Sequence, residues 1–251
     1  MIPKIIHFCW LSDEPYPAVI ERCIASWKEK LPDYQIKKWD TSIFDINSVP
    51  YVKEAYEERK WAFAADYIRL HAIYTEGGIY LDSDVLVQKT FDAFLDNPCF
   101  SAIEFNENDY LDILLKGIVD KNGNLLKDTD IVHGCGIQAA VIASEKGNQF
   151  IADCLNHYKD RHFKQPDGTL DNKIIAPDVM ASVAVKYGFK YKDTEQRLND
   201  GTLILPSSYI GGHIGTSDPN YLAVHCCAGS WRKLSLIDRL KRKIRYWLYV
   251  K

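Results

Sequence analysis

Two acidic residues stand one residue apart near the middle of the chain, in the segment Asp82-Ser83-Asp84. The segment follows Ile79-Tyr80-Leu81, a short apolar run that is typical of a buried strand. Because side chains alternate along an extended chain, we expect both carboxylates on one side and Ser83 on the other. Paired carboxylates suit a divalent cation that shares its remaining positions with water and substrate phosphates. The segment predicts such a site, although a solvated loop shows the same pattern.

A second pair of charged residues lies upstream, in a segment that is otherwise apolar. From Trp61 to Tyr74, apolar residues fall on nearly every side of a helical wheel, which predicts a helix buried all round. Asp66 and Arg69 stand three residues apart on this helix, where their side chains can pair. Burying each charge costs on the order of several kcal/mol unless it is paired and hydrogen-bonded. We therefore expect that these two charged side chains bind a ligand.

The elements before this helix must position both pairs. The run Lys4–Trp10 predicts a strand, which we expect to be the central first strand of a sheet. An amphipathic helix over 17–30 and a strand over 34–39 follow, and strand-helix-strand begins a nucleotide-binding α/β unit. Asp40 follows the second strand, at the edge where open α/β sheets place ligands, but a turn aspartate explains it equally well.

Shorter elements are predicted in the rest of the chain. Gly77-Gly78 suits a helix cap with a sharp reversal, and Asn122-Gly123 suits a hairpin or an insertion. Asp178 is expected to cap the helix that follows Pro177. The other predicted elements are a helical connector over 49–59, a helical turn over 91–95, helices over 148–158 and 179–187, and strands over 85–87, 99–103, 137–143, 203–206 and 221–225.

The string from Ala62 to Asp84 as a whole resembles glycosyltransferase family 32, whose sugar-binding region contains a D-x-D motif. This group includes bacterial capsular and surface-polysaccharide transferases and yeast mannosyltransferases, and more distantly the glucosyltransferase domain of large clostridial toxins. The matching positions are Ala65-Asp66, Arg69, Leu70, Gly77-Gly78, Tyr80, Asp82 and Asp84. The resemblance implies an α/β, GT-A-like fold, a Rossmann-like nucleotide-binding mixed sheet flanked by helices, in a single domain over residues 1–231.

The resemblance also implies a metal site that holds the diphosphate of a nucleotide sugar. Asp84 would bind Mn²⁺ or Mg²⁺ directly, Asp82 would contact the metal or the ribose, and His225 would complete the shell. The closing string H-C-C-A-G-S-W places Ser230 and Trp231 where they would hydrogen-bond the diphosphate. Imidazole can complete a carboxylate-metal shell and an indole N–H can donate to a phosphate oxygen, so these roles are chemically coherent.

Donor binding is implied for further residues of the matching segments. Trp10, at the end of the PKIIHFCW string, would stack on the nucleotide base, although it could equally fill the core. Asp66 and Arg69 would hold hydroxyls of the donor sugar, and Tyr80 belongs to the same donor-binding set. Gln138 stands where the family commonly has an asparagine that contacts the sugar, and this departure weakens its assignment.

The C-terminal segment 232–251 has a charge pattern of its own. It carries eight basic residues against the single acid Asp238, with apolar residues at three-to-four spacing. This pattern predicts a basic amphipathic helix, which can lie on an anionic membrane surface. Packing on the domain or a subunit contact explains the pattern as well. A membrane role would suit an enzyme that builds on lipid-linked saccharides.

The composition narrows the functional classes. The 251 residues are 47% hydrophobic, which is enough for one domain with a sizeable core. The net charge of −3 argues against a general nucleic-acid binder. The chain has seven cysteines without C-x-x-C spacing, no visible signal sequence and no membrane-length apolar run. These features predict a cytoplasmic protein. If the segment 232–251 binds a membrane, the protein is expected to be peripheral on its inner face. Cys226-Cys227 is interpreted as a buried pair in a strand.

Together these features predict a metal-dependent, retaining glycosyltransferase with a nucleotide-sugar donor and a saccharide acceptor. UDP-sugar is the first expectation for the donor and GDP-mannose the second, with surface or capsular polysaccharide as the setting. Two other interpretations stay open. A metal-dependent phosphohydrolase can carry a D-x-D motif, though generally after the first strand of its domain, and a non-catalytic carbohydrate-binding protein could retain the acidic pair.

Overall fold

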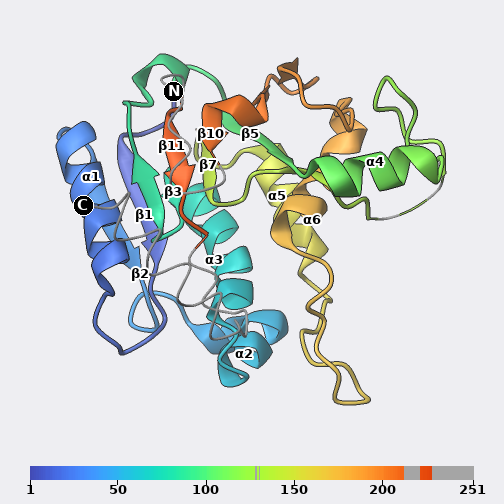
Figure 1. Ribbon diagram of the computed structural model, residues 1–251. Helices are drawn as coiled ribbons and strands as arrows, with labels where there is room; N and C mark the ends of the chain where they lie inside the picture. Colours follow the sequence, from blue (N-terminus) through green and yellow to red (C-terminus); the bar gives the residue numbers. More distant parts are fainter. Residues whose placement is uncertain (128, 130, 212–220, 228–251) are drawn as a thin grey trace.

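The computed structural model describes residues 1–127, 129, 131–211 and 221–227, and these form a mixed α/β fold with helices on both faces of a central sheet (Figure 1). The helices are α1 (Ala18–Lys30), α2 (Pro50–Glu57), α3 (Trp61–Glu76), α4 (Glu107–Leu115), α5 (Gln149–His157) and α6 (Ala176–Ala184). The strands of the main sheet are β1 (Ile5–Cys9), β2 (Gln35–Trp39), β3 (Gly78–Leu81), β5 (Cys99–Phe105), β6 (Cys135–Ile137), β7 (Val141–Ser144), β8 (Gln196–Arg197) and β9 (Leu203–Leu205). The fold class expected from the sequence is thus confirmed.

The main sheet has the strand order β2-β1-β3-β7-β5-β9-β8, with β6 paired to β5. β1 is parallel to both β2 and β3, so the three strands end at the same edge. The expectation of a central first strand is wrong: β1 is interior but lies next to the edge strand β2, because the later strands are added on the side of β3. A smaller sheet contains β10 (Ile210–Gly211), β11 (Ala223–His225) and β4 (Val85–Val87), in that order.

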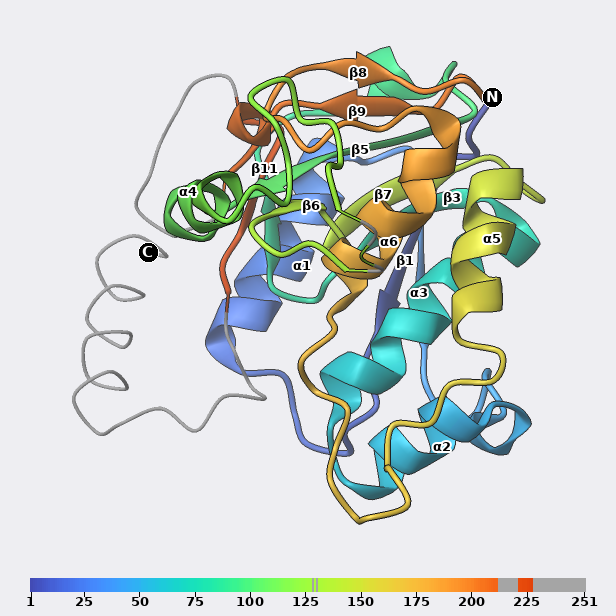
Figure 2. The same ribbon diagram turned by 90° about the vertical axis from the view of Figure 1, so that its right-hand side faces the viewer.

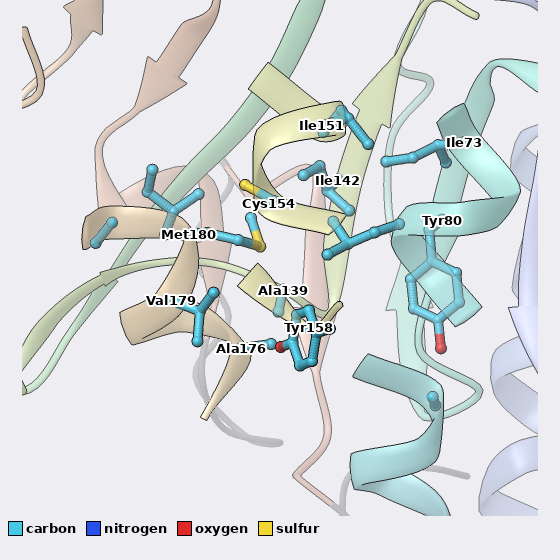
Figure 3. Close-up of a cluster of buried hydrophobic side chains, with 14 of the residues drawn as sticks. Ile73, Tyr80, Ala139, Ile142, Ile151, Cys154, Tyr158, Ala176, Val179 and Met180 are labelled. Atoms are coloured by element: carbon cyan, nitrogen blue, oxygen red, sulfur yellow. The ribbon is translucent and has the colours of Figure 1, made fainter. Parts of the chain in front are cut away.

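Helix α1 covers one face of the sheet, and α3, α5 and α6 cover the other, as the two perpendicular views show (Figures 1 and 2). α3 is packed between the sheet, α2 and α5, which explains why apolar residues occur on nearly all of its sides. Ile73 of α3, Ile142 of β7 and Ile151 of α5 meet in this core (Figure 3). The predicted all-round burial of this helix is confirmed, and the helix continues two residues beyond Tyr74 to Glu76.

Two glycines make the reversal from α3 into β3 possible. Gly77 and Gly78 both have positive φ, 72° and 114°, a region that L side chains rarely adopt. A Cβ on Gly78 would lie 2.6 Å from the carbonyl oxygen of Ile5, so a side chain would separate β3 from β1. The predicted cap and reversal are confirmed, and their role is to start β3 in register with β1.

Several element predictions need correction in the second half of the chain. The strand expected over 137–143 is two strands, β6 and β7, and residues 138–140 between them form a loop. Helix α6 begins at Ala176, three residues before its expected start, with Pro177 in its first turn. Asp178 therefore lies within the helix and does not cap it, because its carboxylate pairs with His133 at 2.7 Å.

The segment between β5 and β6 combines one missed element with one confirmed element. Its polar composition hid helix α4, which Asn106 caps by accepting hydrogen bonds from the backbone N–H groups of Asn108 and Asp109. The hairpin around Asn122-Gly123 is confirmed by an antiparallel bridge between Val119 and Leu125. The remaining predicted helices and strands correspond to α1, α2, α5, β2, β4, β5, β9, β11 and the 3₁₀ turn Asp92–Phe94.

The cysteines are all free thiols. The expectation of a buried Cys226-Cys227 pair in a strand is wrong, because Cys227 is exposed and has a positive φ of 48°, which ends the strand. Ser230, Trp231 and the predicted helix over 232–251 lie outside the described residues. Within the described residues, no helix combines the length and the apolar character needed to cross a membrane.

Candidate active site

The Asp82-Ser83-Asp84 segment forms a turn between β3 and β4. The N–H of Val85 donates to the carbonyl oxygen of Asp82 at 2.9 Å, and the N–H of Asp82 donates to the carbonyl oxygen of Ala140 at 2.8 Å. The expectation of an extended chain with both carboxylates on one side is therefore wrong in its geometry. The two carboxylates are nevertheless close, because the tight turn, and not the alternation of a strand, brings them together.

His225 joins these carboxylates from the far end of the chain. β11 pairs antiparallel with β4, which places His225 opposite Val85, and the N–H of Cys226 donates to the carbonyl oxygen of Asp84 at 2.9 Å. Nε2 of His225 lies 3.4 Å from Oδ1 of Asp84 and 3.9 Å from Oδ2 of Asp82. Burial acts to lower the pKa of His225, but Asp84 outweighs it and raises this pKa well above its ordinary value.

Asp82, Asp84 and His225 form a candidate metal site, which we call the acidic trio. One ligand atom from each residue lies within 4.8 Å of the others. Two carboxylates and an imidazole match the ligand preferences of Mn²⁺, and the carboxylates alone match those of Mg²⁺. The donor set therefore fits the divalent cation that the sequence predicts.

The predicted pairing of Asp66 and Arg69 is confirmed, and we call these two residues the buried pair. Nη2 of Arg69 lies 2.8 Å from Oδ1 of Asp66 and 3.5 Å from Oδ1 of Asp82. Its remaining groups are also occupied, since Nη1 donates to the carbonyl oxygen of Ala139 at 2.7 Å and Nε donates to that of Ala65 at 3.2 Å. Burial raises the pKa of Asp66 to about 7, although Arg69 opposes this shift. Arg69 thus connects the buried pair to the acidic trio.

Tyr80 supports the site from the strand below it. The side chain is buried, and its hydroxyl donates to Oδ1 of Asp82 at 2.9 Å. The Tyr80 ring also lies 5.0 Å from the guanidinium carbon of Arg69. Tyr80 therefore fixes the positions of Asp82 and Arg69, both of which belong to the predicted site.

Gln138 begins the loop 138–140 that Arg69 contacts. Its side-chain oxygen accepts a hydrogen bond from the N–H of Ala140 at 3.0 Å, and its own N–H donates to the carbonyl oxygen of Ala102 at 2.7 Å. The side-chain NH₂ group is consequently the part of Gln138 with which it can donate to a ligand. The structure brings Gln138 to the same loop as the Ala139 carbonyl, next to the buried pair.

Trp10 lies at the same edge of the sheet as the acidic trio. The parallel register of β1 with β3 pairs His7 with Tyr80, so the residues that follow both strands lie at neighbouring positions. Trp10 packs edge-on against Tyr16 at 4.8 Å between ring centroids and lines an open hollow of about 590 Å³. Asp40 lines the same hollow, where it pairs with Lys38 at 2.7 Å. Trp10 is partly buried and also packs against the core that contains Phe8 and Trp27, so both the base-stacking and the core-filling interpretations stay predictions.

His7 and Glu104 were not identified by sequence reasoning. His7 is buried, its Nδ1 accepts from the Trp39 indole at 3.0 Å, and its Nε2 is 2.8 Å from the carbonyl oxygen of Gly77, to which it donates. This neutral histidine fixes the reversal before β3, and burial lowers its pKa accordingly. Glu104 of β5 interacts electrostatically with His225 and Asp82, and no local sequence pattern indicates its proximity to them.

The chain is similar to glycosyltransferases in part of its sequence and in its fold. Residues 17–101 match the family model described as a glycosyltransferase sugar-binding region containing a DXD motif. An inositol phosphoceramide mannosyltransferase of Schizosaccharomyces pombe is 33% identical over 106 residues, which cover 39% of this chain and 29% of that protein. A protein of Acanthamoeba polyphaga mimivirus, named as an uncharacterized glycosyltransferase, is 23% identical over 186 residues. The alignment covers 70% of this chain and 74% of the viral protein.

Solved structures are similar in fold. The crystal structure of the galactosyltransferase LgtC with donor and acceptor sugar analogues has a TM-score of 0.50 and 15% sequence identity, covering 98% of this chain and 95% of LgtC. At this level of identity the likeness is one of architecture. The chain spans less than a third of the length of the yeast relative, so the activity of that whole protein does not transfer to this one.

Proposed function

We propose that this protein is a metal-dependent glycosyltransferase, because residues 17–101 match the family model of the DXD sugar-binding region and the fold is similar to that of LgtC. It moves a hexose from a nucleotide sugar to a saccharide acceptor. The observation that carries the proposal is the acidic trio, which unites Asp82 and Asp84 with His225, 141 residues after Asp84, at the edge where open α/β sheets bind ligands.

Each group of residues has one part in this reaction. The acidic trio holds the cation, which neutralises charge that develops on the departing diphosphate. Asp66 and Arg69 hold hydroxyls of the donor sugar and align its anomeric carbon with the acceptor, so that orientation carries much of the rate. Gln138 donates to the sugar, Trp10 stacks on the base, and Ser230 and Trp231 donate to the diphosphate.

Several finer features belong to the same proposal. The reaction retains the anomeric configuration, the donor is a UDP-sugar with GDP-mannose as the alternative, and the cation is Mn²⁺ or Mg²⁺. The acceptor is lipid-linked, in the synthesis of a surface polysaccharide. The domain comprises residues 1–231, and the basic segment 232–251 binds an anionic membrane surface. An unchanged soluble fraction in the presence of anionic lipid vesicles would contradict the last point.

A hydrolysis screen tests the proposal directly. Purified protein is incubated with Mn²⁺ and each of a set of UDP- and GDP-hexoses, including mannose, glucose and galactose, and release of the nucleoside diphosphate is measured. Turnover of one donor that is lost in Asp84→Ala supports the proposal and identifies the donor. Release of free phosphate from simple monoesters would favour a phosphohydrolase, and nucleotide-sugar binding without turnover would favour a binding protein.

A further inference from the structure

Glu104 lies on the strand face that is directed toward the acidic trio. Along β5, Ile103 and Phe105 pack in the core that contains α3, α5 and α6. Ala102 packs instead in the second core, which also contains Val85 of β4 and Ala223 of β11. Because side chains alternate along a strand, Glu104 shares the face of Ala102. On β11 the same alternation puts His225 on the face of Ala223, so Glu104 and His225 are both on faces that border the second core.

The charged neighbours of Glu104 locate it more closely. Its carboxylate interacts with His225 and Asp82 of the acidic trio on one side, and with Asp178 of α6 on another, whereas Arg69 contributes less. The Asp178 carboxylate is itself paired with His133, whose Nδ1 lies 2.7 Å from Oδ2. Glu104 therefore lies among the charges of the acidic trio, the buried pair and the first turn of α6, since the Asp66 carboxylate also interacts with it.

Among the residues that the structure describes, the carboxylate of Glu104 has no hydrogen-bond or ion-pair partner, and the side chain is partly buried. Burial accordingly raises the pKa of Glu104, and His225 opposes the shift. A partly buried carboxylate without a donor is unfavourable, so a substrate hydroxyl that donates to it would be stabilised there.

In the proposed function, the donor takes the other sides of the site. The nucleotide base lies in the hollow at Trp10, which is also lined by Asp40 after β2, and the donor sugar lies against the buried pair on α3. We therefore assign the acceptor to the remaining side, next to β5, β6 and α6. We propose that Glu104 is a catalytic residue that orients the acceptor hydroxyl, or water in hydrolysis, and receives its proton. This inference rests on the proposed function.

The transfer step balances with Glu104 in this role. The acceptor oxygen bonds to the anomeric carbon on the face from which the diphosphate departs, as retention requires, and the bond from that carbon to the diphosphate oxygen breaks with its electron pair left on the diphosphate. The acceptor proton passes to the Glu104 carboxylate and then to solvent. Donor hydrolysis follows the same course with water as the acceptor, so it reports on Glu104 without a known sugar acceptor.

The test compares donor hydrolysis by wild type, Glu104→Gln and Glu104→Asp, with Glu107→Gln as a control carboxylate on the exposed side of α4. We expect Glu104→Gln to lower kcat about a hundredfold, with donor KM and the Mn²⁺ dependence changed less than about twofold. Glu104→Asp keeps the carboxylate and should recover part of the rate, and Glu107→Gln should match wild type. Thermal midpoints confirm that each variant is folded.

The outcomes are separable. A wild-type rate in Glu104→Gln overturns the inference and leaves the proposed function intact. A raised donor KM or a weakened Mn²⁺ dependence with unchanged kcat also overturns it, since Glu104 would then belong to the donor site. A wild type that hydrolyses no donor overturns the proposed function, and the inference with it.

Discussion

The buried pair and the acidic trio are neighbouring groups of charges with opposite electrostatic balance. The buried pair contains one carboxylate and one guanidinium, and the surrounding carbonyl oxygens occupy the other donors of Arg69. The acidic trio contains two carboxylates and an imidazole whose charge depends on them. The first is complete with protein groups alone, whereas the second carries excess negative charge that a cation would balance. The comparison indicates that the buried charges of this site fix its geometry in one group and, in the proposed function, bind a cation in the other.

The strongest test of this contrast removes one half of the buried pair. Arg69→Met leaves Asp66 as an uncompensated buried carboxylate, and we expect the free energy of unfolding to fall by about 3–5 kcal/mol. Urea denaturation measures the change. The double variant Asp66→Asn/Arg69→Met should recover part of it. Additive losses in the double variant would show that the two side chains are not a self-compensating unit.

Removal of one carboxylate from the acidic trio should act on turnover and not on folding. Asp84→Asn keeps the size of the side chain but weakens cation binding, so we expect Mn²⁺-dependent donor turnover to fall by about a hundredfold or more. Steady-state kinetics measure the loss. Asp112→Asn, on the exposed side of α4, is the matched control and should retain the wild-type rate. Equal rates in both variants would remove Asp84 from the metal site.

The cation itself should stabilise only the protein with an intact trio. A ligand that binds only the folded state, at a free concentration of about ten times its Kd, adds about 1.4 kcal/mol to the free energy of unfolding. We expect Mn²⁺ to produce this increase in wild type and in Asp66→Asn, but not in Asp84→Asn. Thermal denaturation with and without Mn²⁺, and with chelator, provides the measurement. An equal increase in Asp84→Asn would place the ion elsewhere.

Loss of the surface ion pair between Asp40 and Lys38 should change the free energy of unfolding least. Lys38 and Ser42 lower the pKa of Asp40 to about 2 from an ordinary 3.8, so Asp40 adds stability above pH 3.8 that is lost as pH falls through about 2. Because the pair is solvent-accessible, we expect Asp40→Asn to cost less than about 1 kcal/mol at pH 7. The difference between the variant and wild type should disappear near pH 2. A difference that grows at low pH would contradict the assignment.

Local patterns predicted much of the fold but not its irregular middle. Glycines and apolar periodicity located α3 and β3, because both signals act within a few residues. Helix α4 was missed since its exposed, polar surface has little amphipathic pattern, and its cap Asn106 was hidden in a polar run. The break between β6 and β7 was missed because both flanks are apolar, while Arg69 fixes the loop through the Ala139 carbonyl, a contact made across 70 residues.

Residue types and spacing along the chain determined the pairing of Asp66 with Arg69, the acidic character of Asp82 and Asp84, and the reversal at Gly77-Gly78, since each depends on a helix or a turn that forms locally. Tertiary structure alone decided that His225 meets the carboxylates, that Tyr80 and Arg69 contact Asp82, and that Glu104 faces the same site. These contacts join strands and helices far apart in sequence, and only the order and register of the sheets bring them together.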